Sequence, residues 1–77
     1  MQELLTHLAR ELVDHPDQVR VEAIEREGGE LLLELHVAPE DVGKVIGKQG
    51  RVARALRTVV KASSVRAGRR VHVEIAG

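Results

Sequence analysis

Residues 41–51 read "DVGKVIGKQGR" and place three glycines and three cations in eleven positions. Gly47 and Gly50 interrupt an apolar pattern of helical spacing that restarts at Arg51. Two helices joined by a short glycine turn are the expected result, with a Gly-x-x-Gly loop at residues 47–50.

Two phosphate-binding motifs fail on the spacing of these glycines. A P-loop needs four residues before its Gly-Lys pair and then a Ser or Thr, but only "KVI" separates Gly43 from Gly47, and Gln49 takes the place of the hydroxyl residue. The dinucleotide fingerprint fails because the first two glycines are too far apart and no strand leads directly into them. Nucleotide hydrolysis and hydride transfer are therefore excluded. Gly43 lies one helical turn before the loop, and we expect it to allow close packing between helices.

Hydrophobic periodicity supplies the elements on either side of this turn. Leucines at helical spacing predict a first helix that stops near Val13 or Asp14, because Pro16 disfavours helix before it. Alternating apolar residues predict strands in 18–26 and 31–37, joined by a hairpin turn at "EGGE", and a last strand in 69–75. The predicted inward-facing residues are Val19, Val21, Ala23, Leu31, Leu33, Leu35 and Val37 in the first two strands, Val52, Ala55, Leu56, Val59 and Val60 in the long helix, and Val71, Val73 and Ile75 in the last strand.

The predicted fold class is therefore α+β, in one domain covering residues 1–77. The order is helix, strand, strand, helix, helix, strand, with the helices on one face of a three-stranded sheet. No cysteine is present, which excludes disulfides and thiolate metal sites. The N-terminal region fits neither a signal peptide nor a membrane span, so we expect a cytoplasmic protein with no membrane partner.

Charge is divided unevenly along a chain whose formal net charge is zero. Residues 1–38 hold three arginines against nine acids, whereas residues 39–77 hold nine cations against three acids. The basic half is also the half with the glycine turn. Such a polarised surface favours a polyanion as partner.

A Gly-x-x-Gly loop between two helices is typical of KH domains, which clamp single-stranded nucleic acid. Glycine lets a sugar-phosphate backbone approach the main chain, the start of the following helix attracts anions, and nearby cations add charge. The predicted RNA-binding residues are Lys44, Ile46, Gly47, Lys48, Gln49, Gly50, Arg51 and Arg54, and the predicted lining of an apolar groove for bases is Val37, Val42 and Val45. Arg57 and Lys61 share the face of Arg54, which is either a solvated helix face or part of the RNA contact.

The chain resembles the KhpA family of small bacterial KH-domain proteins along its whole length. The resemblance is carried by "LVDHP" at 12–16, "VAPEDVGKVIGKQGR" at 37–51, "ALRT" at 55–58 and "RRVHVEI" at 69–75. It implies a type II KH fold, RNA binding, a role as RNA chaperone, and partnership with a larger multi-domain KH protein, KhpB. It further implies a part in regulating cell elongation and cell-wall synthesis.

The sequence also allows two other functions, each with its own requirements. A protein-interaction or dimerisation adaptor, including a homodimer, would use the KH fold as a docking surface. A helix-turn-helix DNA binder would need base-reading side chains, which the start of the second helix offers only as Arg and Thr. We predict no catalytic residue and no cofactor, and no metal site, because His7, His15, His36 and His72 show no paired spacing.

Overall fold

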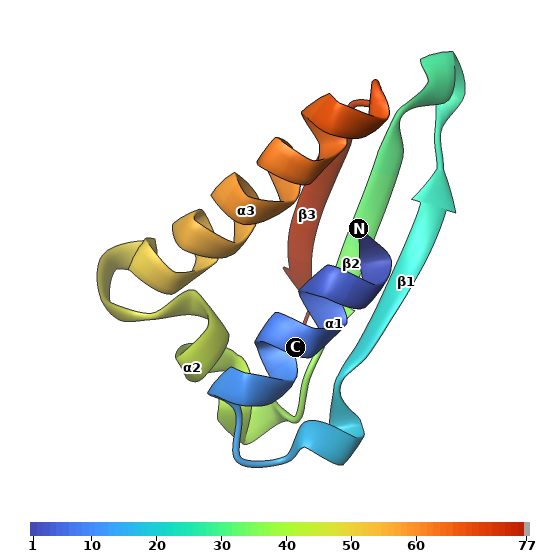
Figure 1. The fold of residues 1–77 in the computed structure, drawn as a ribbon. Coiled ribbons are helices and arrows are strands. Elements are labelled where there is room, and N and C mark those ends of the chain that lie inside the picture. The colour runs from blue at the N-terminus through green and yellow to red at the C-terminus, as the bar shows by residue number, and fades with distance from the viewer. Residues whose placement is uncertain (77) are drawn as a thin grey trace.

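The computed structural model describes residues 1–76, which form the predicted order of three helices and three strands (Figure 1). One-turn 3₁₀ helices occupy the connections at residues 16–18 and 39–41, and tight turns with positive φ angles occupy residues 27–29 and 48–50. The main elements are α1 (Gln2–Leu12), β1 (Arg20–Glu25), β2 (Leu31–His36), α2 (Val42–Ile46), α3 (Arg51–Ala67) and β3 (Val71–Ala76).

The sheet has the order β1-β2-β3 and mixes two kinds of pairing. β1 runs antiparallel to β2, with Val21 opposite Leu35, and this confirms the predicted hairpin. β3 runs parallel to β2, with Val73 beside Leu33. The parallel pairing requires a long crossover, which α2 and α3 provide.

All helices cover the same face of the sheet, as Figure 1 shows, and the core lies between them and the strands. Leu5 of α1, Leu33 and Leu35 of β2, Val45 of α2 and Val60 of α3 are each 0% exposed. The core thus consists of aliphatic side chains, since the chain has no aromatic residue.

The hairpin between β1 and β2 closes as the two glycines of "EGGE" predict. Gly28 and Gly29 have φ angles of 74° and 78°, and the Arg26 N–H donates to the Glu30 carbonyl at 2.8 Å. Arg69 fastens this turn to the start of the last strand. Its Nη2 donates to Glu25 Oε2 at 2.8 Å and to the Gly29 carbonyl at 3.1 Å.

Some predicted core positions are wrong. Ala23 is exposed, because the outer half of β1 extends beyond α1 toward the hairpin turn. In α3 the buried stripe is Ala53, Leu56, Val60 and Ser64, whereas Ala55 and Val59 of the predicted stripe are exposed. The helix is therefore rotated, so that its second apolar edge faces outward beside α1.

Within residues 1–76, no helix combines the length and apolar character needed to cross a membrane.

Candidate nucleic-acid interface

The Gly-x-x-Gly loop is a tight reversal built from left-handed backbone. Gly47 has φ 75° and ψ 171°, a combination that is essentially restricted to glycine, and Gly50 has φ 73°. Between them Gln49 has φ 58°, the one positive φ of a non-glycine residue in the described part of the chain. The loop closes on itself through the Gly50 N–H, which donates to the Gly47 carbonyl at 3.1 Å.

The glycines of this stretch have different structural requirements. A Cβ atom on Gly47 would lie 2.4 Å from Cγ2 of Val52, so this glycine lets the end of α2 pack on the start of α3. A Cβ atom on Gly50 would meet nothing within 4 Å. The predicted packing role of Gly43 is wrong, because its position also faces open space and its φ needs no glycine.

A buried carboxylate holds the base of the loop to the end of α1. Asp41 is 1% exposed, and its two oxygens accept hydrogen bonds from the backbone N–H groups of Asp14 (3.3 Å) and His15 (3.0 Å). This interaction explains the "LVDHP" segment, whose chain must turn after α1 to present both N–H groups.

Lys44 also contacts the segment that follows α1. Its Nζ donates to Oδ2 of Asp14, and this hydrogen bond lowers the pKa of Asp14 and raises the pKa of Lys44 relative to their ordinary values. Both side chains are largely exposed, so solvent screens the pair. Lys44, a predicted phosphate-binding cation, thus already has a carboxylate partner.

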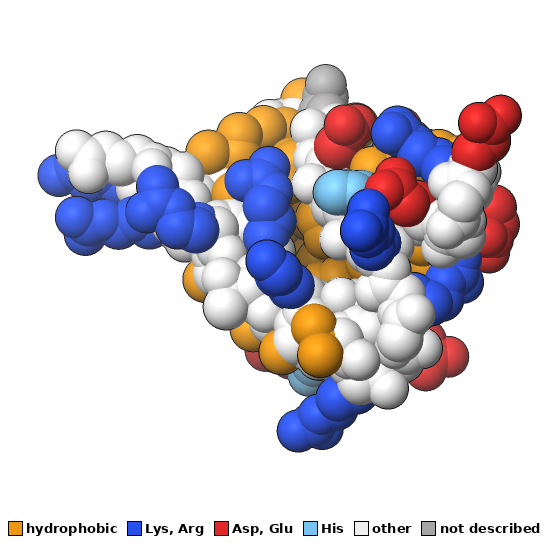
Figure 2. Space-filling view, turned by 90° about the horizontal axis from the view of Figure 1, so that it is seen from above, with side chains coloured by type: hydrophobic (Ala, Val, Ile, Leu, Met, Phe, Trp, Pro, Cys, Tyr) orange, Lys and Arg blue, Asp and Glu red, His pale blue; other side chains and the backbone are white. Residues whose placement is uncertain are grey.

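The positive charges of the other cations at the loop have no acidic partner in the described part of the chain. Within residues 1–76, no ion pair or side-chain hydrogen bond involves the charged groups of Lys48, Arg51 or Arg54. The N-cap of α3 is Gly50, so no side chain caps the first turn of that 17-residue helix. Figure 2 shows Lys and Arg side chains gathered over the α2–α3 turn and along α3, with Asp and Glu on the hairpin side.

The predicted groove lining needs correction. Val45 and Val37 are 0% and 8% exposed and belong to the core, so they support the site from beneath and offer no surface to a base. Val42 is half-buried against the same core. Ile46 differs from them, because it is 38% exposed directly beside the loop.

An open groove lies instead between α3 and the edge strand β3. Arg57 crosses it at one point, where its Nε donates to the Val73 carbonyl at 3.3 Å. Figure 2 shows this hollow, floored by hydrophobic side chains between groups of basic ones. The residues that line it are Arg57, Lys61, Ser64, Val65, Arg69, Arg70, Val71, His72 and Val73.

A second groove, between α1 and α3, is almost entirely apolar. It follows from the rotation of α3, which leaves Val59 42% exposed beside Leu12, itself 39% exposed. Arg51, at the start of α3, is among the residues that line this groove and is not among those that line the groove between α3 and β3. The remaining lining residues are Leu8, Glu11, Val52, Ala55 and Leu56.

Comparison with known protein families matches residues 2–75 to the family described as KhpA/KhpB, KH domain. The chain belongs to this family. Its KH domain confirms the resemblance drawn from the loop and the flanking segments, and the α-β-β-α-α-β order of the structure agrees with it.

Curated relatives in this family match nearly end to end. The RNA-binding protein KhpA of Clostridium acetobutylicum is 56% identical over 75 residues, which cover 97% of this chain and 99% of the relative. The RNA-binding protein KhpA of Bacillus subtilis is 45% identical, covering 97% and 91%. Both relatives are thus named for RNA binding.

Among solved structures, the fold is similar to part of the crystal structure of Aquifex aeolicus Era bound to GDP and aluminium fluoride. The TM-score is 0.62 at 20% identity, and the match covers 96% of this chain and 28% of the longer one. At this identity the similarity concerns the fold alone.

Proposed function

We propose that this KH domain binds single-stranded RNA by clamping its backbone at the Gly-x-x-Gly loop. The observation that carries the proposal is the coincidence of three features at residues 47–51: open backbone at Gly50, a start of α3 without a side-chain cap, and cations with no carboxylate partner among residues 1–76. Each favours a phosphate group at the same place. The names of the curated relatives support RNA as the ligand.

In this proposal Lys48, Gln49 and Arg51 contact the RNA backbone, and Arg54 extends the contact along α3. Lys44 contributes less, because phosphate must compete with Asp14 for its ammonium group. Ile46 offers an exposed aliphatic surface to a base next to the loop.

The groove between α3 and β3 replaces the apolar lining proposed from sequence. Its hydrophobic floor can contact unstacked bases, and Arg57, Lys61 and Arg70 border it. A KH domain holds about four nucleotides. Without aromatic stacking, recognition relies on aliphatic packing and hydrogen bonds, which predicts weak nucleotide preference.

Mapping the bound oligonucleotide tests this arrangement. A single-stranded RNA added to ¹⁵N-labelled protein should shift the amide resonances of residues 46–54 and of the groove between α3 and β3. Shifts confined to the groove between α1 and α3, or no shifts at all, would contradict the proposed site.

A protein-docking role is the second candidate, favoured by the apolar groove between α1 and α3. Its occupant in this proposal is a second copy of the chain or a KhpB-like multi-domain KH protein, and either would bring further RNA-binding surface through avidity. In that setting the chain would serve in the cytoplasm as an RNA chaperone or post-transcriptional regulator of cell elongation and cell-wall homeostasis.

The two roles can be separated by mutation. Val59→Asp should abolish self-association or partner binding, measured by light scattering and pull-down, and leave RNA contacts at the loop in place. Thr58→Asp is the matched control, because Thr58 is exposed and lies outside the groove lining. Equal association by the parent, Val59→Asp and Thr58→Asp would count against this surface.

A further inference from the structure

The face of the sheet turned away from the helices carries a row of carboxylates. Glu22 of β1 lies directly opposite Glu34 of β2, and Glu34 lies beside Glu74 of β3. Like charges at directly paired positions destabilise a sheet. A row of this kind across three strands therefore favours a bound cation that offsets the repulsion.

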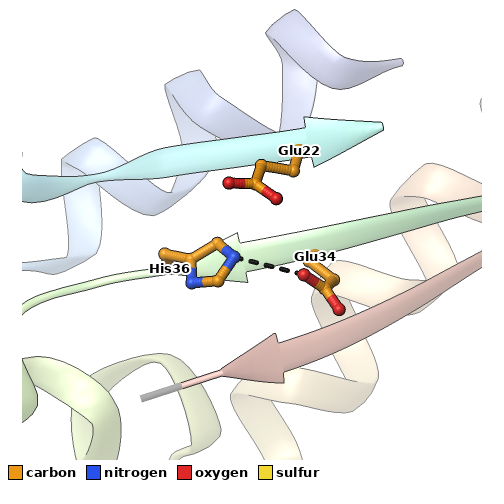
Figure 3. A group of neighbouring side chains, drawn as sticks. All are labelled: Glu22, Glu34 and His36. Carbon is orange, nitrogen blue, oxygen red and sulfur yellow. Dashed lines mark ion pairs between the residues drawn. The ribbon is translucent and has the colours of Figure 1, made fainter. Parts of the chain in front are cut away.

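A histidine with an unsatisfied nitrogen lies next to this row. His36 follows Glu34 by two residues and projects from the same face of β2 (Figure 3). Its Nε2 atom is shielded from solvent and has no hydrogen-bond partner within residues 1–76. The nitrogen lies 3.3 Å from Glu34 Oε1, which is an ion-pair distance without hydrogen-bond alignment.

Glu22, Glu34 and His36 together offer two carboxylate oxygens and one imidazole nitrogen. The three ligand atoms lie within 4.8 Å of one another, and the side chains converge from neighbouring strands (Figure 3). We propose that these residues bind one divalent first-row transition-metal ion, such as Zn²⁺, on the face of the sheet turned away from the helices.

The chemistry of the donors selects this class of ion. Imidazole suits Zn²⁺ and its neighbours, whereas Mg²⁺ and Ca²⁺ prefer oxygen ligands alone. Zn²⁺ binds nitrogen and oxygen at about 2.0–2.2 Å, so tetrahedral ligands lie roughly 3.3 Å apart. His36 and Glu34 already have that separation, and Glu22, whose side chain is 47% exposed, can move to complete the set.

Three protein ligands leave a fourth position for water or for a group from another molecule. Arg20 competes with the ion for Glu22, since its Nη2 lies 3.1 Å from Glu22 Oε1.

The ion would join β1 to β2 and thereby stabilise the hairpin. Because the site lies on the face opposite the helices, its occupancy should not depend on the RNA loop.

The test uses tag-free, chelator-treated protein and two metal probes. Calorimetric titration with Zn²⁺ should show one site per chain, and Co²⁺ should selectively broaden the NMR resonances of Glu22, Glu34 and His36. His36→Gln and Glu22→Gln should each weaken Zn²⁺ binding about tenfold or more, since loss of even an outer-shell partner commonly costs 10–100-fold. Arg20→Gln should tighten it.

The matched control is His72→Gln. His72 is exposed on the same face, with Nε2 3.8 Å from a single carboxylate of Glu30, and its loss should change Zn²⁺ affinity less than about twofold. Circular dichroism verifies the fold of each variant. If His36→Gln fails to fold, the test rests on the Zn²⁺ affinity of Glu22→Gln. The proposal is overturned if Zn²⁺ does not bind, or if His72→Gln weakens binding as much as Glu22→Gln.

Discussion

Gly47 lies so close to Val52 that a Cβ atom on the glycine would meet Val52 Cγ2 at 2.4 Å and the Val52 backbone nitrogen at 2.9 Å. The same glycine has φ 75° and ψ 171°, a region that other residues hardly enter. The reversal between α2 and α3 thus depends on Gly47 for its packing as well as its backbone conformation, whereas Gly50 is bounded only by open space.

Gly47→Ala should destabilise the whole domain. Overpacking costs roughly 1–3 kcal/mol and the backbone strain a further 1–3 kcal/mol, so we expect a loss of about 2–6 kcal/mol in the free energy of unfolding. Urea denaturation measures it. Gly43→Ala is the control and should stabilise the domain by up to about 1 kcal/mol, because Gly43 lies within α2 beside open space. A neutral Gly47→Ala would show that the reversal is not packed as described.

Gly50→Ala should separate binding from folding. The left-handed conformation costs about 1–2 kcal/mol with alanine, but the methyl group meets no protein atom, so the domain should stay folded. If RNA backbone occupies that open space, affinity for a single-stranded oligonucleotide should fall about tenfold or more, the equivalent of roughly 1.4 kcal/mol. Unchanged affinity in a fluorescence anisotropy titration would place the RNA elsewhere.

Asp41→Ala should weaken the connection between α1 and the base of the loop. It leaves the backbone N–H groups of Asp14 and His15 without their acceptor, for which we expect a loss of about 2–4 kcal/mol in unfolding free energy. Glu40→Ala removes a neighbouring exposed acid and should cost less than about 0.5 kcal/mol. Similar losses for both variants would assign Asp41 no special role.

The pair of Asp14 and Lys44 should give a small pH dependence of stability. Because the pKa of Asp14 is lowered in the folded state, its contribution is present above its ordinary value of about 3.9 and is lost as the pH falls through the folded pKa. The pKa of Lys44 is raised, so its contribution is lost only as the pH rises through that higher value.

Comparison with Asp14→Asn by urea denaturation measures the effect. The parent should be more stable at neutral pH, and the difference should disappear in acid. A difference that persists after Asp14 is protonated would have another cause.

Local signals account for the parts of the structure that could be predicted from sequence. Glycine spacing located the loop at residues 47–50, alternating leucines located β2, and "EGGE" located the hairpin. These features depend on backbone conformation and on periodicity within one element. The family resemblance added the expected cellular role and the expected protein partner, which no spacing reveals.

Contacts between distant segments could not be predicted in the same way. Asp41 accepts bonds from residues 26 and 27 positions away, and nothing local distinguishes it from the exposed Glu40. In α3 two adjacent apolar edges made the buried stripe ambiguous, and contact with β3 and α1 decides between them. Glu22, Glu34 and His36 converge only through strand register, which is why histidine spacing gave no sign of them.

The Lys48→Asp/Gln49→Asp double variant, titrated with single-stranded RNA by fluorescence anisotropy, shows whether the loop clamps the RNA backbone. Aspartate tolerates the left-handed conformation that Gln49 adopts, so circular dichroism should show an unchanged fold. A charge-matched control is Arg26→Asp/Gln18→Asp, at exposed positions of the acidic half.

The parent and the control should bind a single-stranded oligonucleotide with a slope of log affinity against log salt near −2 to −3, from roughly −0.7 for each of three or four phosphates. The loop variant should not bind. Retained, salt-sensitive binding by the folded loop variant would contradict the clamp.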